Sequence, residues 1–430
     1  MTIDQSVEPV SPLTPAAIST GVNVTVGIPP KPAPKATGST FVIPSLNGIR
    51  ALSVAVVFFG HAGVTGLPSP LGVTVFFFLS GYLITTLLRM ELEKTGTISF
   101  RAFYLRRTFR ILPPVYLVLA LAYTLTYLGA LGAQKLRLGA CLAQVFFLSN
   151  YQILNSGWDG PHTGRPLGTG DLWSLAIEEH FYLLFPVFYF LLCRFLPQRR
   201  RQAVVLGAIC ALVLAWRCVL ILGLHASFDR TYIGTDTRID SILFGCILAI
   251  LANPYLDRDQ ITGQGSRIKG SWAPLLAPLS ILAIALFAGV ISVNKSLYLH
   301  LTDPKIAGTV QYTVEGLALI PLFYVAVRYH RWGPVKLLNL RAVAFVGGLS
   351  YSIYITHQII ISALHDHLPH GQIGRGLVYT AVTLLVAWAI FCFVERPFAR
   401  LRKHLSRAGG PQVATGTPEA PAILRSEIAS

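Results

Sequence analysis

LGVTVFFFLSGYLITTLLR, the sequence of residues 71–89, is the segment that most clearly indicates the fold class of this chain. The segment carries a single charge, at its last position, and a helix needs about 20 largely apolar residues to cross the hydrocarbon core of a bilayer. Ser80 and Gly81 near its middle are small enough to let a second helix approach closely. We therefore predict a membrane-spanning helix here, packed against other helices.

The composition of the whole chain agrees with this interpretation. Of the 430 residues, 53% are hydrophobic and 13% are charged, whereas soluble proteins carry about 25% charged residues. So little polar surface cannot cover so much apolar mass in water, which excludes one large soluble core. The formal net charge is +16, but most Lys and Arg lie in short connections between apolar runs, as in cytoplasmic loops of membrane proteins. We expect no binding to nucleic acid.

The length criterion places ten spans along the chain. They lie at residues 44–64, 71–89, 111–131, 173–193, 203–223, 237–252, 273–292, 311–328, 343–364 and 376–395. Alternating these spans puts the basic clusters on one side, which the positive-inside rule makes the cytoplasm. The clusters are Arg101, Arg106, Arg107 and Arg110; Arg194 and Arg199 to Arg201; Arg258, Arg267 and Lys269; Arg328, Arg331, Lys336 and Arg341; and Arg400, Arg402 and Lys403. We predict an all-α polytopic membrane protein with about ten transmembrane helices and both termini cytoplasmic.

Three regions follow from this scheme. Residues 1–40 are rich in Pro and have no basic stretch leading into an apolar core, so we expect a disordered tail rather than a signal peptide. Residues 41–400 form the membrane domain, and residues 401–430 a flexible cytoplasmic tail. Within the domain, residues 140–151 are apolar but too short to cross, which indicates a re-entrant or interfacial segment. The six cysteines show no paired spacing, so no disulfide framework or metal cluster is indicated.

The first span contains two ionisable residues, which are costly inside a membrane and are therefore candidates for function. Arg50 lies near its inner end and His61 near its outer end. Eleven residues at 3.6 per turn return both to nearly one face, about 16 Å apart along the axis. They could line one passage. No acid follows His61 in its own segment, so any carboxylate partner must come from another helix; the alternative role for His61 is hydrogen bonding between helices.

Two further segments carry candidate site residues. In FYLRRTFRILPP, residues 103–114, three arginines lie three and four residues apart and could hold a polyphosphate, or else touch anionic lipid headgroups. They are Arg106, Arg107 and Arg110. In DLWSLAIEEHFYLLFP, residues 171–186, the adjacent Glu178 and Glu179 point about 100° apart, so at most one faces a given cavity. Glu178 needs a partner, for which His61 or Arg50 would be suitable.

Other charged or polar positions are read singly as contacts between helices. They are Arg217, Arg238, Asp240, Glu315, Ser350-Tyr351-Ser352, His357 and Glu395-Arg396-Pro397. His365, His367 and His370 fall in an outer loop without other ligands, and we interpret them as solvated. We expect no metal site.

In this order, the motifs resemble the acyltransferase 3 family of integral membrane acyltransferases, over roughly residues 44–397. They are the Arg-to-His first span, GVTVFFFLSGYLI, RRTFRILP, WSLAIEEHFY, Arg238-Ile-Asp240, SYSIYITH and Glu395-Arg-Pro397. The resemblance implies that His61 is the catalytic centre with Arg50 and Glu178 as essential neighbours, and that the arginines of residues 106–110 hold acyl-CoA. It also implies substrate-binding roles, for Trp173, Ser174, Glu179, Tyr182, Tyr351 and His357.

The resemblance further implies transfer of an acetyl or short acyl group from acyl-CoA to a hydroxyl of a sugar, surface glycan, lipid-linked saccharide or secreted metabolite. The enzyme would be a multi-pass protein of the inner membrane, surrounded by lipid, with no permanently bound cofactor. In the expected mechanism, neutral His61 is the general base, a carboxylate orients its ring and Arg50 stabilises developing charge. An acyl-histidine route is the competing version. The alternative function is a transporter or flippase for an anionic or lipid-linked sugar.

Overall fold

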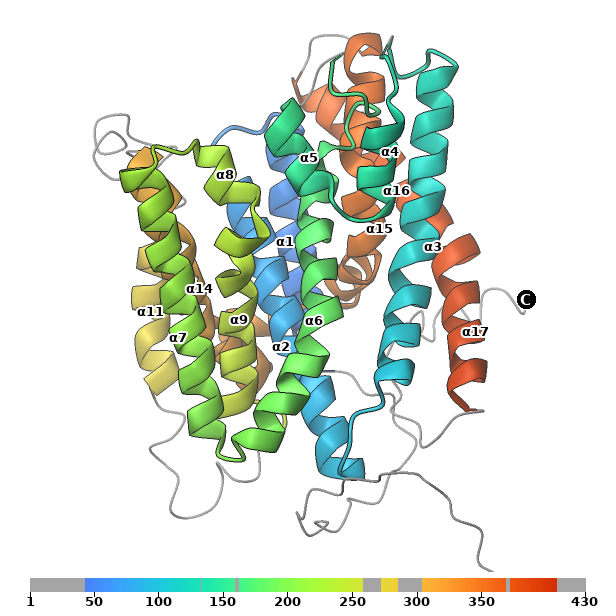
Figure 1. Ribbon diagram of the computed structural model, residues 1–430. Helices are drawn as coiled ribbons and strands as arrows, with labels where there is room; N and C mark the ends of the chain where they lie inside the picture. The colour runs from blue at the N-terminus through green and yellow to red at the C-terminus, as the bar shows by residue number, and fades with distance from the viewer. Residues whose placement is uncertain are drawn as a thin grey trace, which may run out of the picture.

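The computed structural model describes residues 43–132, 134–158, 162–257, 272–284, 304–368 and 372–407, and in these residues the chain is helical without strands (Figure 1). Its long helices are α1 (Leu46–His61), α2 (Ser69–Thr95), α3 (Phe100–Tyr127), α6 (Trp173–Phe195), α7 (Arg199–Cys218), α9 (Thr235–Leu251), α11 (Trp272–Ile284), α14 (Pro304–Arg328), α15 (Arg341–Leu364), α16 (Gln372–Ile390) and α17 (Arg396–Arg407). Its short segments are α4 (Leu138–Val145), α5 (Ser149–Ser156), η1 (Gly170–Leu172), η2 (Val219–Gly223), α8 (Phe228–Ile233), η4 (Gly333–Asn339), η5 (His365–His367) and η6 (Phe391–Glu395).

Several of these helices are long and apolar enough to cross a membrane. Within the described residues there are seven: Ser69–Thr95, Phe100–Tyr127, Gly170–Phe195, Arg199–Gly223, Gly308–Arg328, Arg341–His367 and Ile373–Arg402. Two shorter apolar helices, Leu46–His61 and Ala273–Leu282, coincide with the first and seventh predicted spans. The all-helical, multi-pass architecture is confirmed.

Some sequence predictions concern residues outside the described ranges. They are the tails at 1–40 and from residue 408, the basic residues Arg258, Arg267 and Lys269, His370, and residues 285–292 of the seventh predicted span. At the C-terminal end, α17 continues to Arg407, so the segment expected to be flexible from residue 401 begins as a helix.

Helix α3 starts earlier than the third predicted span. It begins at Phe100, where the Ser99 side chain accepts a hydrogen bond from the backbone N–H of Ala102, and it continues through Pro113 and Pro114. A capping serine stabilises a helix N-terminus, and proline is tolerated in membrane helices where neighbours supply hydrogen bonds. Just before these prolines, Tyr351 of α15 donates a hydrogen bond to the backbone carbonyl of Ile111 at 2.8 Å, which attaches this part of α3 to α15. The basic motif therefore lies on a rigid helix rather than in a loop.

The apolar segment at residues 140–151 forms α4 and α5, each eight residues long. A helix of that length covers only about 12 Å and cannot span a bilayer. Polar bonds attach both to the bundle: Tyr123 of α3 donates to Gln144 at 2.9 Å, and Asn150 donates to Thr235 of α9 at 3.0 Å. Helix α5 lies beside the start of α6, and α4 lies next to α3 (Figure 1).

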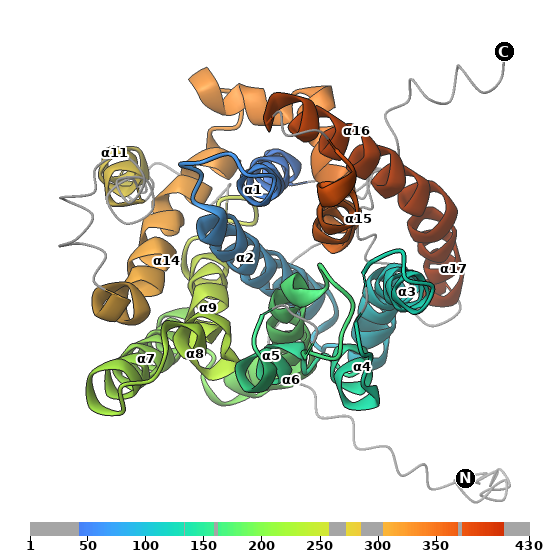
Figure 2. The ribbon, with the colours of Figure 1, turned by 90° about the horizontal axis from the view of Figure 1, so that it is seen from above.

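Helix α2 lies in the middle of the bundle, with α1, α9 and α6 around it (Figure 2). Phe77, Phe78 and Tyr82 are completely buried. At Gly81 an added Cβ would overlap the carbonyl oxygen of Ile242 in α9, and at Gly245 it would overlap that of Phe78 in α2. Each backbone thus packs against a glycine of the other helix, which is how small residues drive helix association in lipid.

Buried ion pairs also join the helices. Arg217 of α7 and Asp240 of α9 are both fully buried and lie 2.7 Å apart. Arg217 also donates to the carbonyls of Thr237 and Thr309, at 2.6 and 2.8 Å. For these two residues, the interpretation as an inter-helix contact is confirmed.

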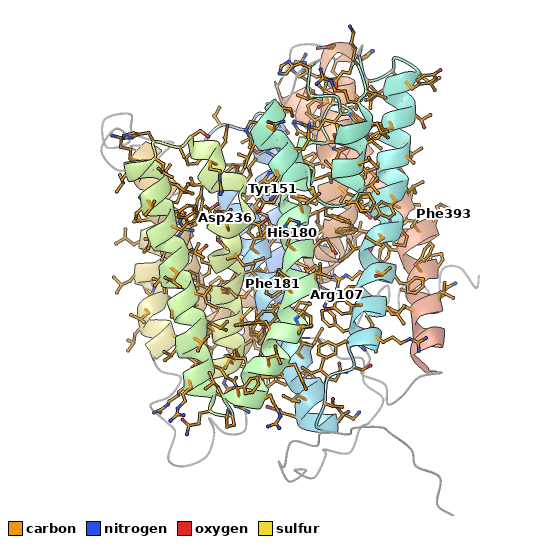
Figure 3. The ribbon with its side chains drawn as sticks, viewed as in Figure 1. Arg107, Tyr151, His180, Phe181, Asp236 and Phe393 are labelled. Carbon is orange, nitrogen blue, oxygen red and sulfur yellow. The ribbon has the colours of Figure 1, made fainter. Side chains whose placement is uncertain are left out.

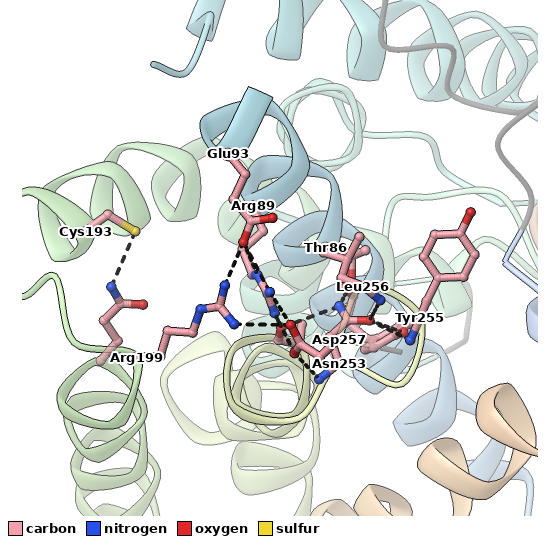
Figure 4. A network of polar contacts seen from close by, with 12 residues as sticks. Thr86, Arg89, Glu93, Cys193, Arg199, Asn253, Tyr255, Leu256 and Asp257 are labelled. Carbon is pink, nitrogen blue, oxygen red and sulfur yellow. Dashed lines mark hydrogen bonds and ion pairs between the residues drawn. The ribbon is translucent and has the colours of Figure 1, made fainter. Parts of the chain in front are cut away.

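A polar network ties the C-terminal part of α2 and the segment after α9 to the start of α7 (Figure 4). The buried Arg89 guanidinium lies 2.7 Å from the Asp257 carboxylate. Arg199 contacts the carboxylates of Glu93 at 2.8 Å and Asp257 at 3.1 Å. Asn253 donates to Thr86 at 2.8 Å. Because each charge meets an opposite one, the network fixes three helix ends at the surface that the basic clusters mark.

The glycine contact predicts a stability effect. Gly81→Val should lower the melting temperature of the detergent-purified protein, because the added side chain overlaps backbone, which costs about 1–3 kcal/mol in a packed core. Gly139→Val, at a glycine with nothing within 4 Å of an added Cβ, is the control and should change it much less. Equal melting temperatures for the two variants would contradict the packing.

The polar network predicts a pH-dependent stability. Burial raises the pKa of the Asp257 carboxyl, but hydrogen bonds from Arg89 and its charge lower it more, so the pKa lies below its ordinary value. A lowered folded-state pKa contributes stability above the unfolded value of about 3.9, and this is lost as the pH falls through the folded pKa. Asp257→Asn should cost roughly 3 kcal/mol at pH 7, as breaking a buried pair does.

Thermal unfolding of wild type and Asp257→Asn between pH 7 and pH 3 measures this pH-dependent contribution to stability. The difference in melting temperature between wild type and Asp257→Asn should narrow below about pH 4, where the Asp257 carboxylate becomes protonated in the unfolded chain before it does in the folded protein. Asp366→Asn is the control, and its difference from wild type should change far less over the same interval, because the carboxylate of Asp366 is 91% exposed to solvent. A difference that stays constant with pH would show that charge at position 257 contributes nothing.

Candidate active site

Three polar side chains meet at the end of the bundle where α1 ends and α6 begins. His61 is the last residue of α1, Asp171 lies in η1 just before α6, and His357 lies within α15. The Nδ1 atom of His61 is 3.0 Å from Nε2 of His357 and 3.2 Å from Oδ2 of Asp171. The same carboxylate oxygen is 3.3 Å from Nε2 of His357. Three elements distant in sequence thus supply one compact cluster.

The two imidazole rings are joined in line rather than stacked. Their planes differ by 4° and their centroids lie 5.2 Å apart, which is the N···N distance plus one ring radius at each end. Both nitrogens therefore lie on the line between the ring centres, as in a linear N–H···N hydrogen bond. Nδ1 of His357 lies 2.7 Å from the backbone carbonyl of Tyr354, so both nitrogens of this ring have hydrogen-bond partners.

The same three ligand atoms are close enough together to be considered for a metal ion. Two imidazoles that share a metal direct their lone pairs at a point beside the line between them, about 2 Å from each nitrogen. Here the lone pairs are directed along the line, where a hydrogen bond fits and a metal does not. This geometry suits a proton shared between the two rings.

A short chain of hydroxyls connects the cluster to the interior. The hydroxyls of Ser174 and Tyr354 lie 2.6 Å apart, and Tyr354 donates to the backbone carbonyl of Asp171 at 3.1 Å. Both side chains also line a cavity of about 90 Å³ inside the bundle. The cavity thus ends beside the histidine cluster.

The cavity is lined by polar groups from five helices. Toward the inner side they include Arg50 of α1 and Arg107 and Arg110 of α3; the others are Ser80 of α2, Glu178 and Tyr182 of α6, and Ser350 and Tyr351 of α15. The labelled Arg107 lies between α3 and α6, on the inner side of His180 (Figure 3). Glu178 accepts hydrogen bonds from Ser80 and Tyr182, both at 3.0 Å.

The guanidinium groups of Arg50, Arg107 and Arg110, which line this cavity, have no carboxylate within ion-pair distance in the described part of the chain. Arg50 donates to Asn47 at 3.2 Å, and Arg107 lies over the ring of Tyr182 at 5.2 Å. A smaller cavity of about 40 Å³ shares Arg50 and Arg110 and reaches Arg402 of α17. Positive charge in excess of carboxylate therefore surrounds the inner part of this space.

The structure gathers most of the residues that the sequence singles out. Lining the cavity are Arg50, Arg107, Arg110, Ser174, Glu178, Tyr182 and Tyr351, whereas His61 and His357 form the adjoining cluster. Arg106 points elsewhere and pairs with Glu91 at 3.0 Å, because it lies on the next face of α3. Glu179 does not line the cavity, and the buried Trp173 packs against Phe77 and Tyr232.

The carboxylate beside His61 is Asp171, which the sequence reasoning did not select. Glu178, the expected partner, lies two turns further into α6, where it bonds Ser80 and Tyr182. The sequence held a signal for the correct residue. The alternating spans put the end of the first span and the start of the fourth at the same outer level, which places Asp171, not Glu178, opposite His61.

Comparison with known proteins gives a consistent family. The sequence model of an acyltransferase domain family matches residues 43–392. O-acetyltransferase OatA of Staphylococcus aureus strain NCTC 8325 / PS 47 is 31% identical over 369 residues, which are 83% of this chain and 57% of that protein. OatA of strains COL and MRSA252 gives the same values. The chain thus spans little more than half the length of these relatives. No solved structure matches it.

Proposed function

Since this chain belongs to the acyltransferase 3 family, we propose that it is a membrane O-acyltransferase that moves an acetyl or short acyl group from acyl-CoA to a hydroxyl. The acceptor is a sugar, a cell-surface glycan, a lipid-linked saccharide or a secreted metabolite. Transfer of acetyl to oxygen is the activity named for the OatA relatives, and we extend it to this chain.

One observation carries the proposal: a histidine cluster adjoins a cavity lined by three arginines that form no ion pair with any residue the structure describes. A charged group inside a membrane protein needs an opposite charge, so an anion is expected to complete the site. Acyl-CoA has phosphates at one end and a thioester at the end of a thin, flexible arm. Guanidinium groups bind phosphate bidentately, and the arm suits a narrow cavity.

The distance between the two ends supports this arrangement. Arg50 and His61 are eleven residues apart on one helix, which is about 16 Å along its axis. An extended pantetheine arm can bridge such a distance. With the phosphates held by the arginines of α1 and α3, the thioester would lie near Ser174, Tyr354 and the histidine cluster.

In the proposed reaction, His61 takes the proton of the acceptor hydroxyl while the hydroxyl oxygen attacks the thioester carbonyl. The proton then passes to the departing CoA thiolate. Asp171 lies 3.2 Å from His61 and stabilises the imidazolium. Arg50 lies too far along α1 to act on the developing oxyanion, so we assign it to the donor phosphates. In the competing route the acyl group first bonds to His61.

Glu178 has a different role from the one expected. It lies among the arginines and is held by Ser80 and Tyr182. A carboxylate there limits the repulsion among the cations and keeps them in place while the site is empty. We propose that it positions Arg50 and Arg107 rather than His61.

We also propose the finer topology. All ten predicted spans cross the inner membrane, both termini are cytoplasmic, and the Arg89–Asp257 network lies at the cytoplasmic surface. Residues 41–400 form the catalytic domain between two tails, with lipid around it, and nucleic acid, a metal and a resident cofactor play no part. Donor binding then occurs from the cytoplasm and the acceptor approaches His61 from the outer side.

A substitution at His61 tests the proposed general base. His61→Ala should lower the rate of acyl transfer by at least 100-fold, because general-base catalysis contributes about 10²–10⁴-fold. CoA release from acetyl-CoA by membranes containing the protein measures the rate. His365→Ala, in the exposed η5, should behave as wild type.

Retention of wild-type transfer by His61→Ala would exclude both the base and the acyl-histidine route. Membranes that move a labelled sugar across the bilayer but consume no acetyl-CoA, with or without His61, would instead support the transporter.

Substitutions at the arginines test the proposed donor site. Arg107→Gln and Arg110→Gln should each raise KM for acetyl-CoA by about 10-fold or more with a smaller change in kcat, since a hydrogen bond between charged groups contributes about 1.5–3 kcal/mol. Arg106→Gln is the matched control, one residue away on α3 but engaged by Glu91. A KM for Arg106→Gln as high as those of the other two would contradict the proposed donor site.

A further inference from the structure

The hydrogen bonds of His357 determine where the protons of the cluster lie. A backbone carbonyl only accepts, so the 2.7 Å contact with Tyr354 requires a proton on Nδ1 of His357. A neutral imidazole with a proton on one nitrogen is an acceptor at the other. Nε2 of His357 therefore carries a lone pair, and the in-line contact at 3.0 Å must be donated by Nδ1 of His61.

This assignment leaves the free lone pair of His61 on Nε2. That nitrogen is the one that a base needs, because Nδ1 already uses its proton to bond His357. Exposure supports the same division, since the His61 side chain is 31% exposed whereas His357 is completely buried. His61 can meet an acceptor hydroxyl, and His357 can act only through His61.

Asp171 contributes in another way. Its Oδ2 atom is close to both imidazoles, at 3.2 and 3.3 Å, but within the described residues this buried atom has no hydrogen bond of acceptable geometry. The carboxylate lies beside the N–H···N axis rather than on it. Its negative charge therefore favours a protonated pair, while the proton positions of the neutral pair are set by His357.

We propose that His357 and Asp171 are the positioning residues of His61: His357 fixes the tautomer that exposes a basic Nε2, and Asp171 stabilises the imidazolium formed when that nitrogen takes the acceptor's proton. The inference rests on the proposed acyl transfer. Atoms balance in the step, because the acceptor O–H bond and the thioester C–S bond break, an ester C–O bond forms, and the proton leaves on the CoA thiol. The arrangement resembles the base and its orienting partner in a Ser-His-Asp triad, with a second histidine in the orienting place.

In the described part of the chain, the other titratable groups near this cluster are tyrosines, and one of them, Tyr232 of α8, interacts electrostatically with Asp171. Tyr354 of α15 bonds Ser174 and the backbone of Asp171, and Tyr379 of α16 packs against Phe58 of α1. None of these tyrosines hydrogen-bonds to the Nδ1 atom of His61, whose partner is His357. A pH profile of the reaction should therefore report mainly on the pair of histidines and Asp171.

The test compares three substitutions at position 357. His357→Gln keeps an amide oxygen that can accept from Nδ1 of His61, whereas His357→Leu has no acceptor and the polar side chain of His357→Asn is too short to reach. We expect kcat to fall by about 100-fold or more in the Leu and Asn variants, as when a triad loses its orienting partner, and by less than about 10-fold in the Gln variant. KM for acetyl-CoA should stay within about threefold in all, because the arginines are untouched.

Asp171→Asn gives an independent readout. Removing the charge destabilises the imidazolium, so the acid limb of the kcat profile should move to lower pH while kcat itself falls. A residue with a purely structural role would lower the amount of folded enzyme and leave that limb in place. Thermal unfolding of each purified variant separates the two effects.

The outcomes distinguish this inference from the proposed function. If His61→Ala is inactive but His357→Leu and His357→Asn keep wild-type kcat, or if Gln restores nothing, then acyl transfer stands and the role of His357 is overturned. An unshifted acid limb in Asp171→Asn would overturn the role of Asp171. Full activity of His61→Ala would overturn the proposed function itself.

Discussion

The cost of placing charge inside a bilayer governs this structure. Each buried ionisable group must find an opposite charge, a set of hydrogen bonds or a polar cavity. Arg217 and Asp240 satisfy each other completely between α7 and α9. Glu315 accepts from Thr74 at 2.7 Å and Gln311 at 2.8 Å, while Arg238 lies over the ring of Tyr312 at 3.7 Å. Arg238 also donates to Thr74 at 3.1 Å, so these side chains join α2, α9 and α14.

The three arginines that line the cavity differ from the buried charges that join helices. Arg50, Arg107 and Arg110 lie on two helices that converge on one space, and within the described residues no carboxylate pairs with them. Glu178 is near but is engaged by two hydroxyls. Three cations held close together repel one another, so their arrangement is sustained by the bundle and is ready for an anion. Structural and functional charges are thus told apart by their partners.

Helix α1 sets the distance between the two ends of the site. It carries Arg50 in the cavity and His61 in the outer cluster, so one rigid element sets the distance between anion site and base. Its contact with α15 is close, because a side chain at Gly347 would overlap the backbone of Asn47. The same α15 supplies Tyr351, Tyr354 and His357. Two tightly packed helices therefore position both ends of the site, and α6 with η1 adds the carboxylates.

The sequence by itself determined the class of protein, the places of its main helices and most of the residues at the site, because apolar length and helical period are local properties. It placed Arg50 and His61 on one face for the same reason. It did not separate Arg106 from its neighbours, it left His61 and Arg50 open as partners of Glu178, and it did not select Asp171. Those questions depend on which helix faces which and at what depth, and only the tertiary structure decided them: side chains hundreds of residues apart, such as His61 and His357, meet because glycine contacts and buried ion pairs fix the register of the helices that carry them.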